Sequence, residues 1–138
     1  MLRRLRFGLT AVFLALVVMF SSVAQAKSIE LRNVKRIYIE RMPNNLDEYL
    51  GSAISSQFHG NVEVVMDRSH ADAILMAENI NAQDTQHSTV RLLDKRKKTV
   101  LWSGSAGDRS LKTLAINHGG QKTIADNLMA ELHKAMTR

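Results

Sequence analysis

The strongest local concentration of charge in the chain is the run Lys95-Arg96-Lys97-Lys98. Such a run is typical of a solvated turn, but it can also bind phospholipid head groups, lipid A phosphates or an acidic partner. Each cation contributes about 1 kcal/mol near an anionic membrane, so four of them matter only alongside other contacts. Lys95, Arg96, Lys97 and Lys98 are therefore our candidate contact with an anionic surface.

The tightest group of metal-ligand residue types is His70-Ala71-Asp72, with Asp67 nearby. A metal site needs a third or fourth ligand at a defined spacing. Nothing in the spacing of the other histidines brings them to this group; they are His59, His87, His118 and His133. Scattered surface histidines are the simpler interpretation, and a small metal-dependent hydrolase that uses His70 and Asp72 is kept as an alternative.

Nucleophilic catalysis has no recognisable motif in the chain. Cysteine is absent, and Gly104-Ser105-Ala106-Gly107 lacks the spacing of a nucleophile elbow. Asp47 and Glu48 are explained better by helix capping than by acid–base chemistry. The backbone of 118–120 precedes a helix and in principle suits an anion, although a loop entering a helix explains it more simply. We expect no enzyme activity, no catalytic residue and no bound cofactor or metal.

The first 26 residues have the three-part layout of a secretory signal peptide. Three arginines within the first six residues precede an unbroken apolar run over 11–20, and Ala24-Gln25-Ala26 has the small residues that a signal peptidase reads. The run is shorter than the roughly 20 apolar residues that span a bilayer. We expect cleavage after Ala26, which releases 27–138 as one periplasmic or secreted domain. A retained anchor is the alternative.

Composition narrows the class of domain that follows. Without cysteine there is neither a lipid anchor nor a disulfide, so stability must come from an ordinary core. Removing the three arginines of the signal leaves 16 basic and 13 acidic residues, so the net charge falls from +6 to +3. This value is ordinary for a soluble domain. We expect no nucleic-acid partner and no stable membrane anchor after cleavage.

Five segments have the β-branched, aromatic or alternating pattern of strands. The segment 73–77 is apolar at every position, as expected of a central strand. The run 94–98 predicts a hairpin connection between the last two strands. Trp102 lies on the face shared with Val100, which favours a core position over an exposed partner contact. The predicted strands are 34–39, 62–66, 73–77, 89–93 and 99–103.

Two segments predict amphipathic helices. Asn45 has the position of an N-cap and Glu48 completes a capping-box pattern, while Gly60 is placed to end the first helix. The second helix covers 121–136 and carries basic residues in its final turns, where they suit the helix dipole. The apolar stripes are Leu46, Leu50, Ile54 and Phe58 in the first helix and Ile124, Leu128, Leu132 and Met136 in the second.

The predicted order is strand, helix, four strands, helix. Two amphipathic helices each need an apolar surface, and a largely antiparallel sheet offers one. We therefore expect an α+β two-layer sandwich, with a mixed, mostly antiparallel sheet of about five strands and both helices on one face. The polar stretch 79–87 predicts a loop or an irregular strand extension.

A series of motifs in this order resembles a group of uncharacterised exported bacterial proteins. The motifs are Ile37-Tyr38-Ile39-Glu40, Leu46-Asp47-Glu48-Tyr49-Leu50, Val64-Val65-Met66-Asp67-Arg68, Ala71-Asp72-Ala73-Ile74-Leu75, Val90-Arg91-Leu92-Leu93-Asp94, Val100-Leu101-Trp102-Ser103 and Gly107-Asp108-Arg109-Ser110. The chain also resembles three envelope domains: the amino-terminal domain of the Tol-system propeller protein, the periplasmic part of the curli secretion channel and the lipopolysaccharide-assembly lipoprotein. The resemblance implies binding or assembly without catalysis. No lipidated cysteine, propeller or pore-forming segment is present, so no partner and no site residue carries over.

We therefore expect a non-catalytic binding or assembly module of the bacterial cell envelope. Its partner would be an envelope protein or complex, contacted through a sheet edge or the hairpin at 94–98. The first alternative is contact with anionic lipid or lipopolysaccharide through Lys95, Arg96, Lys97 and Lys98. The second is the metal-dependent hydrolase.

Overall fold

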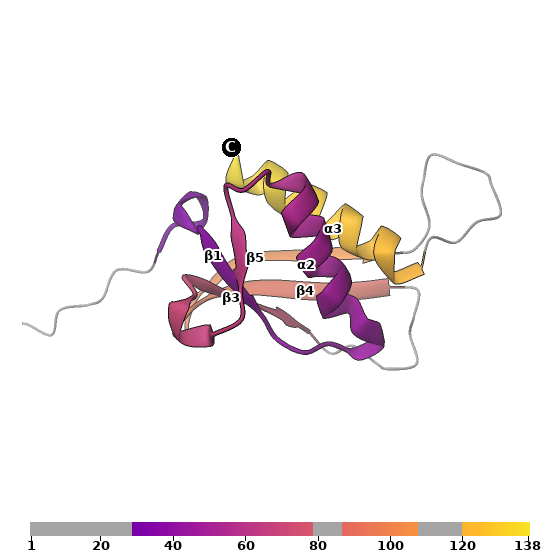
Figure 1. Cartoon of the computed structure of the whole chain (residues 1–138), viewed down its shortest axis with the longest axis horizontal. Coiled ribbons are helices and arrows are strands. Elements are labelled where there is room, and N and C mark those ends of the chain that lie inside the picture. Colours follow the sequence, from indigo (N-terminus) through magenta and orange to yellow (C-terminus); the bar gives the residue numbers. More distant parts are fainter. Residues whose placement is uncertain (1–28, 79–86, 108–119) are drawn as a thin grey trace, which may run out of the picture.

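The secondary-structure elements follow the predicted order along the chain (Figure 1). The computed structural model describes residues 29–78, 87–107 and 120–138. The predicted signal peptide and His118 lie outside these residues. The strands are β1 (Arg36–Ile39), β2 (Glu63–Val65), β3 (Ala73–Ala77), β4 (His87–Asp94) and β5 (Val100–Gly107), and the helices are α2 (Leu46–Gln57) and α3 (Gly120–Met136).

The five strands form one mixed sheet in the order β2-β1-β3-β4-β5. β1 pairs in parallel with both β2 and β3, while β4 is antiparallel to β3 and to β5. The predicted α+β class is confirmed. Two of the four pairings are parallel because crossover connections, rather than hairpins, join the first three strands.

The two helices lie side by side against one face of the sheet (Figure 1). The residues of their predicted apolar stripes are buried, apart from the partly buried Met136, and they join inward-facing strand residues in one core. The helices also contact each other directly, since Gln57 Nε2 donates to the Asp126 carbonyl at 3.0 Å and the Phe58 ring meets the His133 ring edge-on. The strand residues of the core include Ile37, Ala73, Leu75, Val90 and Leu92.

A short connection covers part of the opposite face. β2 and β3 are parallel but not adjacent, so the segment between them, which contains the 3₁₀ turn η4 (Arg68–His70), must cross β1. α2 already occupies the helical face, and right-handed crossovers place the second connection on the other side. Ile74 points away from the core residues Ala73 and Leu75 by strand alternation, and it is nevertheless fully buried. The second face is therefore covered at Ile74 as well.

The start of α2 differs from the prediction. Asn45 adopts a left-handed backbone (φ 58°) and its side chain makes no capping hydrogen bond, so the predicted capping box is wrong. A side-chain N-cap needs an extended backbone, which Asn45 does not have. Asp47 acts locally instead, because its Oδ1 accepts the Met42 N–H at 3.2 Å and ties the incoming chain to the first turn.

A β-bulge changes the faces of β5. Leu92 pairs with Trp102 whereas the next residue, Leu93, pairs with Val100, so the register shifts by one residue at Leu101. Trp102 therefore lies on the helical face and packs against the core, while Val100 is 49% exposed. The predicted core position of Trp102 is confirmed in part, but the argument that it shares a face with Val100 is wrong.

Candidate functional site

The predicted basic run forms the hairpin turn between β4 and β5, and all four of its residues are exposed. Asp94, which is only 7% exposed, holds the backbone of this turn through hydrogen bonds. Asp94 Oδ1 accepts the backbone N–H of Lys98 at 2.9 Å and of Thr99 at 3.3 Å, and the Asp94 carbonyl accepts the Lys97 N–H at 2.8 Å. The cations therefore project from an ordered backbone.

The four cations of the turn are not equivalent. Lys97 Nζ forms an ion pair with Glu40 at the end of β1, and Arg68 of η4 pairs with the same carboxylate at 3.5 Å. Within the described parts of the chain, Lys95, Arg96 and Lys98 make no ion pair. The predicted set of four thus provides three cations whose charge is available to a partner.

A fifth cation, Lys35, joins this end of the sheet through Asp72. Asp72 Oδ2 accepts the backbone N–H of Lys35 at 3.0 Å, and the Asp72 carbonyl accepts the Lys95 N–H at 3.2 Å. Lys35 is exposed and has no ion pair among the described residues. We call Lys35, Lys95, Arg96 and Lys98 the basic end. Sequence reasoning missed Lys35 because it precedes the turn by about sixty residues.

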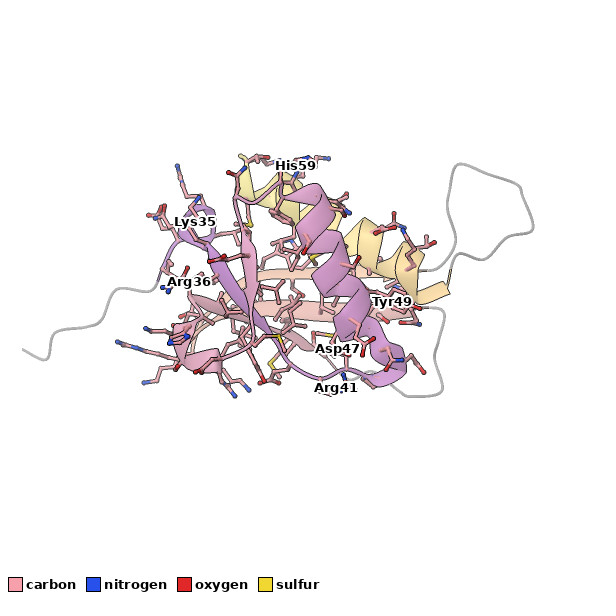
Figure 2. All side chains as sticks on the ribbon, in the orientation of Figure 1. Lys35, Arg36, Arg41, Asp47, Tyr49 and His59 are labelled. Carbon is pink, nitrogen blue, oxygen red and sulfur yellow. The ribbon has the colours of Figure 1, made fainter. Side chains whose placement is uncertain are left out.

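Asp72 is a structural acid at this end of the sheet. Its carboxylate also accepts the Arg36 N–H at 2.9 Å and pairs with the Arg36 guanidinium at 3.1 Å. Burial raises the pKa of the Asp72 carboxyl, but the two backbone donors and the guanidinium outweigh this effect and bring the pKa below its ordinary value of 3.8. Figure 2 shows Lys35 and Arg36 beside each other near the start of β1.

The histidines predicted to be scattered lie on separate elements. His70 is exposed on η4, and both oxygens of the neighbouring Asp72 are already bonded to β1. His87 Nε2 lies 3.2 Å from Ser105 Oγ on the adjacent strand, and His133 packs on Phe58. Over 29–78, 87–107 and 120–138, no three His, Asp or Glu side chains are arranged to hold a metal ion.

A groove lies between the start of α2 and the ends of β1 and β2. It encloses about 440 Å³ and is bounded on one side by the edge strand β2. Its β2 wall is apolar and incompletely covered, and Met66 at the end of this wall is 92% exposed. We call it the edge groove. Its lining residues are Tyr38, Ile39, Arg41, Asp47, Glu48, Gly51, Val64, Val65 and Met66.

The rim of the edge groove is charged. Arg41 Nη1 lies 3.2 Å from Asp47 Oδ2 and 3.4 Å from Glu48 Oε1. Asp47 is mostly buried, whereas the side chains of Arg41 and Glu48 are 77% and 64% exposed. Figure 2 shows Arg41 and Asp47 together at the beginning of α2, away from Lys35 and Arg36. The chain thus presents an apolar groove with a mixed rim and a separate basic end.

The floor of the edge groove contains a glycine inside a helix. Gly51 is the sixth residue of α2, where glycine costs about 0.5–1 kcal/mol relative to alanine. Packing does not require it, since a Cβ at this position would meet only Ile39 Cδ1, at an ordinary 3.8 Å. Sequence reasoning missed the groove because its walls come from three segments. The interior glycine and the apolar end of β2 were the available signals.

Comparison with protein-family models, curated proteins and solved structures finds no match to this chain. The resemblance to envelope domains therefore stays a prediction. Neither α2 nor α3 has the length and apolar character needed to cross a membrane, and the same holds for every other described helix.

Proposed function

We propose that this chain is a non-catalytic binding or assembly module of the bacterial cell envelope, which works in the periplasm or outside the cell after removal of residues 1–26. The observation that carries the proposal is the edge groove, an apolar cleft beside a sheet edge that no described strand covers. Concave apolar sites with a few polar groups at the rim are typical of binding surfaces. The partner is an envelope protein.

The hydrolase alternative depends on His70 and Asp72. The Asp72 carboxylate is engaged in structural hydrogen bonds from Lys35 and Arg36. Among the described residues, no three His, Asp or Glu side chains that include His70 are grouped so that they could hold a metal ion. We therefore favour the two binding hypotheses.

Contact with anionic lipid is the second candidate, favoured by the unpaired cations of the basic end. Four cations at about 1 kcal/mol each give about 4 kcal/mol, which corresponds to a dissociation constant near 1 mM. This is too weak to hold the domain on a membrane by itself. The basic end is better suited to steering the domain toward an acidic surface than to anchoring it.

Site-specific photo-crosslinking in intact cells tests the leading proposal. A photoreactive residue replaces Met66 beside the edge groove, and a control replaces Glu131, which is exposed on α3. We expect a discrete protein adduct from position 66 and none of the same mass from position 131. Identical adduct patterns at both positions, or none at position 66, would count against binding through this groove.

Vesicle co-sedimentation tests the lipid candidate. Wild type is compared with the triple variant Lys95→Ala, Arg96→Ala and Lys98→Ala, using vesicles of phosphatidylglycerol and phosphatidylcholine over a salt series. A control with the same charge change carries Lys122→Ala and Lys134→Ala on α3 together with Arg138→Ala just after that helix. Lipid contact predicts salt-sensitive binding that only the first variant loses. Equal loss in both variants would indicate a net-charge effect and no basic-end site.

A further inference from the structure

We infer that the edge groove receives an extended protein segment, which pairs with the free edge of β2 and seats one apolar side chain over Gly51, with a basic residue two positions away on the same face. This inference rests on the proposed binding function and adds the chemistry of the partner. Strand addition of this kind takes its affinity from main-chain hydrogen bonds and its specificity from alternate side chains.

β2 has an unused hydrogen-bonding edge on the side away from β1. The Glu63 N–H donates to the Lys35 carbonyl at 2.9 Å, and β2 pairs in parallel register with β1. Residues of a parallel strand alternate between its two neighbours, so the N–H and C=O of Val64 point outward. β2 has no second partner among the described strands. An incoming extended segment would complete these bonds.

The wall of the groove beside that edge is apolar. Val64 and Val65 are partly exposed, and Met66 is almost fully exposed where the strand ends. A methionine is flexible and polarisable, so it can pack on apolar side chains of different shape. A segment paired with β2 would bring every second side chain to this wall. One apolar side chain of the segment would therefore be buried in the groove.

Gly51 lines the groove on the α2 side. It weakens the helix, and the fold has room for a methyl group at this position. The absence of a side chain at this position also leaves space for a side chain of a bound segment. Here the missing side chain keeps the floor of the groove open toward Val64 and Met66. The cavity above Gly51 is therefore the expected seat of the apolar side chain.

The rim of the groove carries charged side chains of both signs. Arg41 faces two carboxylates, Asp47 and Glu48, so the rim retains one net negative charge. Glu48 is the more exposed of the two acids and is reached most easily from outside. A lysine or arginine two positions from the inserted apolar residue lies on the same face and would complement this charge, whereas an acidic residue there would be repelled.

The closing experiment measures binding of defined peptides to the purified protein by fluorescence anisotropy. The probe, called the Leu-Lys peptide, is a labelled nonapeptide of threonines with Leu-Thr-Lys at its centre, because residues two positions apart in a strand share one face. Matched peptides carry serine in place of the leucine, or glutamate in place of the lysine. We expect the Leu-Lys peptide to bind at least about tenfold more tightly than either, because one replacement removes apolar burial and the other reverses the charge. Amide resonances of Val64, Val65 and Met66 should shift on binding.

Two variants separate groove filling from a change in stability. Gly51→Ala should raise the melting temperature and weaken binding of the Leu-Lys peptide at least about tenfold, because the new methyl group occupies the seat. Ser52→Ala, at the exposed neighbouring position of the same helix, should raise helix propensity without changing affinity.

Several results would overturn the inference. These are undetectable binding of the Leu-Lys peptide, equal binding of all three peptides, and unchanged affinity in Gly51→Ala. A dimer that Gly51→Ala dissociates would assign the groove to a second copy and also overturn it. The proposed function has a separate readout. A specific adduct from position 66 together with failed peptide binding would retain the binding role and reject this occupant.

Discussion

Asp72 accepts the backbone N–H of Arg36 at 2.9 Å and pairs with the guanidinium of the same residue at 3.1 Å. One carboxylate therefore fixes both the main chain and the side chain at the start of β1. The backbone of Asp72 adds two further hydrogen bonds. Its N–H donates to the Arg36 carbonyl, and its carbonyl accepts the Lys95 N–H. Asp72 thus connects β1, β3 and the β4–β5 turn.

Replacing Asp72 should destabilise the fold more than removing its ion-pair partner. Asp72→Ala leaves the N–H groups of Lys35 and Arg36 without an acceptor, and we expect a loss of about 1–3 kcal/mol in the free energy of unfolding. Arg36→Met removes only a half-exposed ion pair, so its cost should stay below about 1 kcal/mol. Urea denaturation monitored by circular dichroism measures both. Equal losses would assign the effect to the ion pair.

Acid should weaken the fold through the same carboxylate. The pKa of Asp72 is lower in the folded protein than its ordinary value of 3.8, so the unfolded chain binds the proton first as the pH falls. The contribution is complete above that value and is lost as the pH falls through the folded pKa. Wild type should therefore lose more stability than Asp72→Asn between about pH 5 and pH 3.

Asp67 provides the control for this pH experiment. A hydrogen bond from the Ser69 hydroxyl, together with the Ser69 backbone N–H, lowers the pKa of Asp67 as well. Asp67 is exposed and its contacts stay within η4, so Asp67→Asn should change the acid dependence less than Asp72→Asn. Parallel pH curves for wild type and Asp72→Asn would show that Asp72 is not the responsible group.

The position of Trp102 depends on Gly104. Both residues face the helices, and a Cβ at Gly104 would collide with ring atoms of Trp102. Gly104→Ala should force the indole outward, shift its fluorescence to longer wavelength and cost about 1–3 kcal/mol. Ser103→Ala on the opposite face of the strand should leave the emission unchanged. Trp102 is the only tryptophan, so the signal reports on this ring alone.

The order of the basic turn depends on Asp94. Asp94→Ala removes the acceptor of two turn N–H groups, and we expect about 1–3 kcal/mol of destabilisation. Asp94→Asn keeps an acceptor oxygen and should cost less. Hydrogen exchange at Lys98 and Thr99 should accelerate strongly in the alanine variant and only modestly in the asparagine variant. Unchanged exchange in Asp94→Ala would mean that the backbone alone orders the turn.

The elements that the sequence predicts well are those whose residues repeat with a regular period. β3 was predicted with its observed bounds, and the stripe of α2 is buried as expected from Leu46 to Phe58. Such patterns are local, because burial of one face requires an apolar residue at every second position of a strand or at every third to fourth position of a helix. Hydrophobic spacing, together with the turn signals between the elements, therefore predicted the order of the elements and the α+β class.

The features that could not be predicted depend on backbone conformation or distant pairing. The left-handed Asn45 displaced a capping pattern, and the bulge at Leu101 reversed the alternation that placed Val100 beside Trp102. Parallel pairing of β1 with β2 and β3 brought Lys35 to the basic end and built the edge groove. No local pattern encodes these pairings, so the site was predicted only where it is continuous in sequence.

The packing of α2 on α3 has a consequence for how the protein is made. Gln57 bonds to Asp126, 69 positions later, and α3 covers the side of α2 that faces it. A chain that emerges amino end first, at about 5–20 residues per second, keeps this side of α2 uncovered for several seconds. During that interval the nascent chain offers an uncovered amphipathic helix to any chaperone or export factor. This exposure ends once α3 has been synthesised and packs against α2.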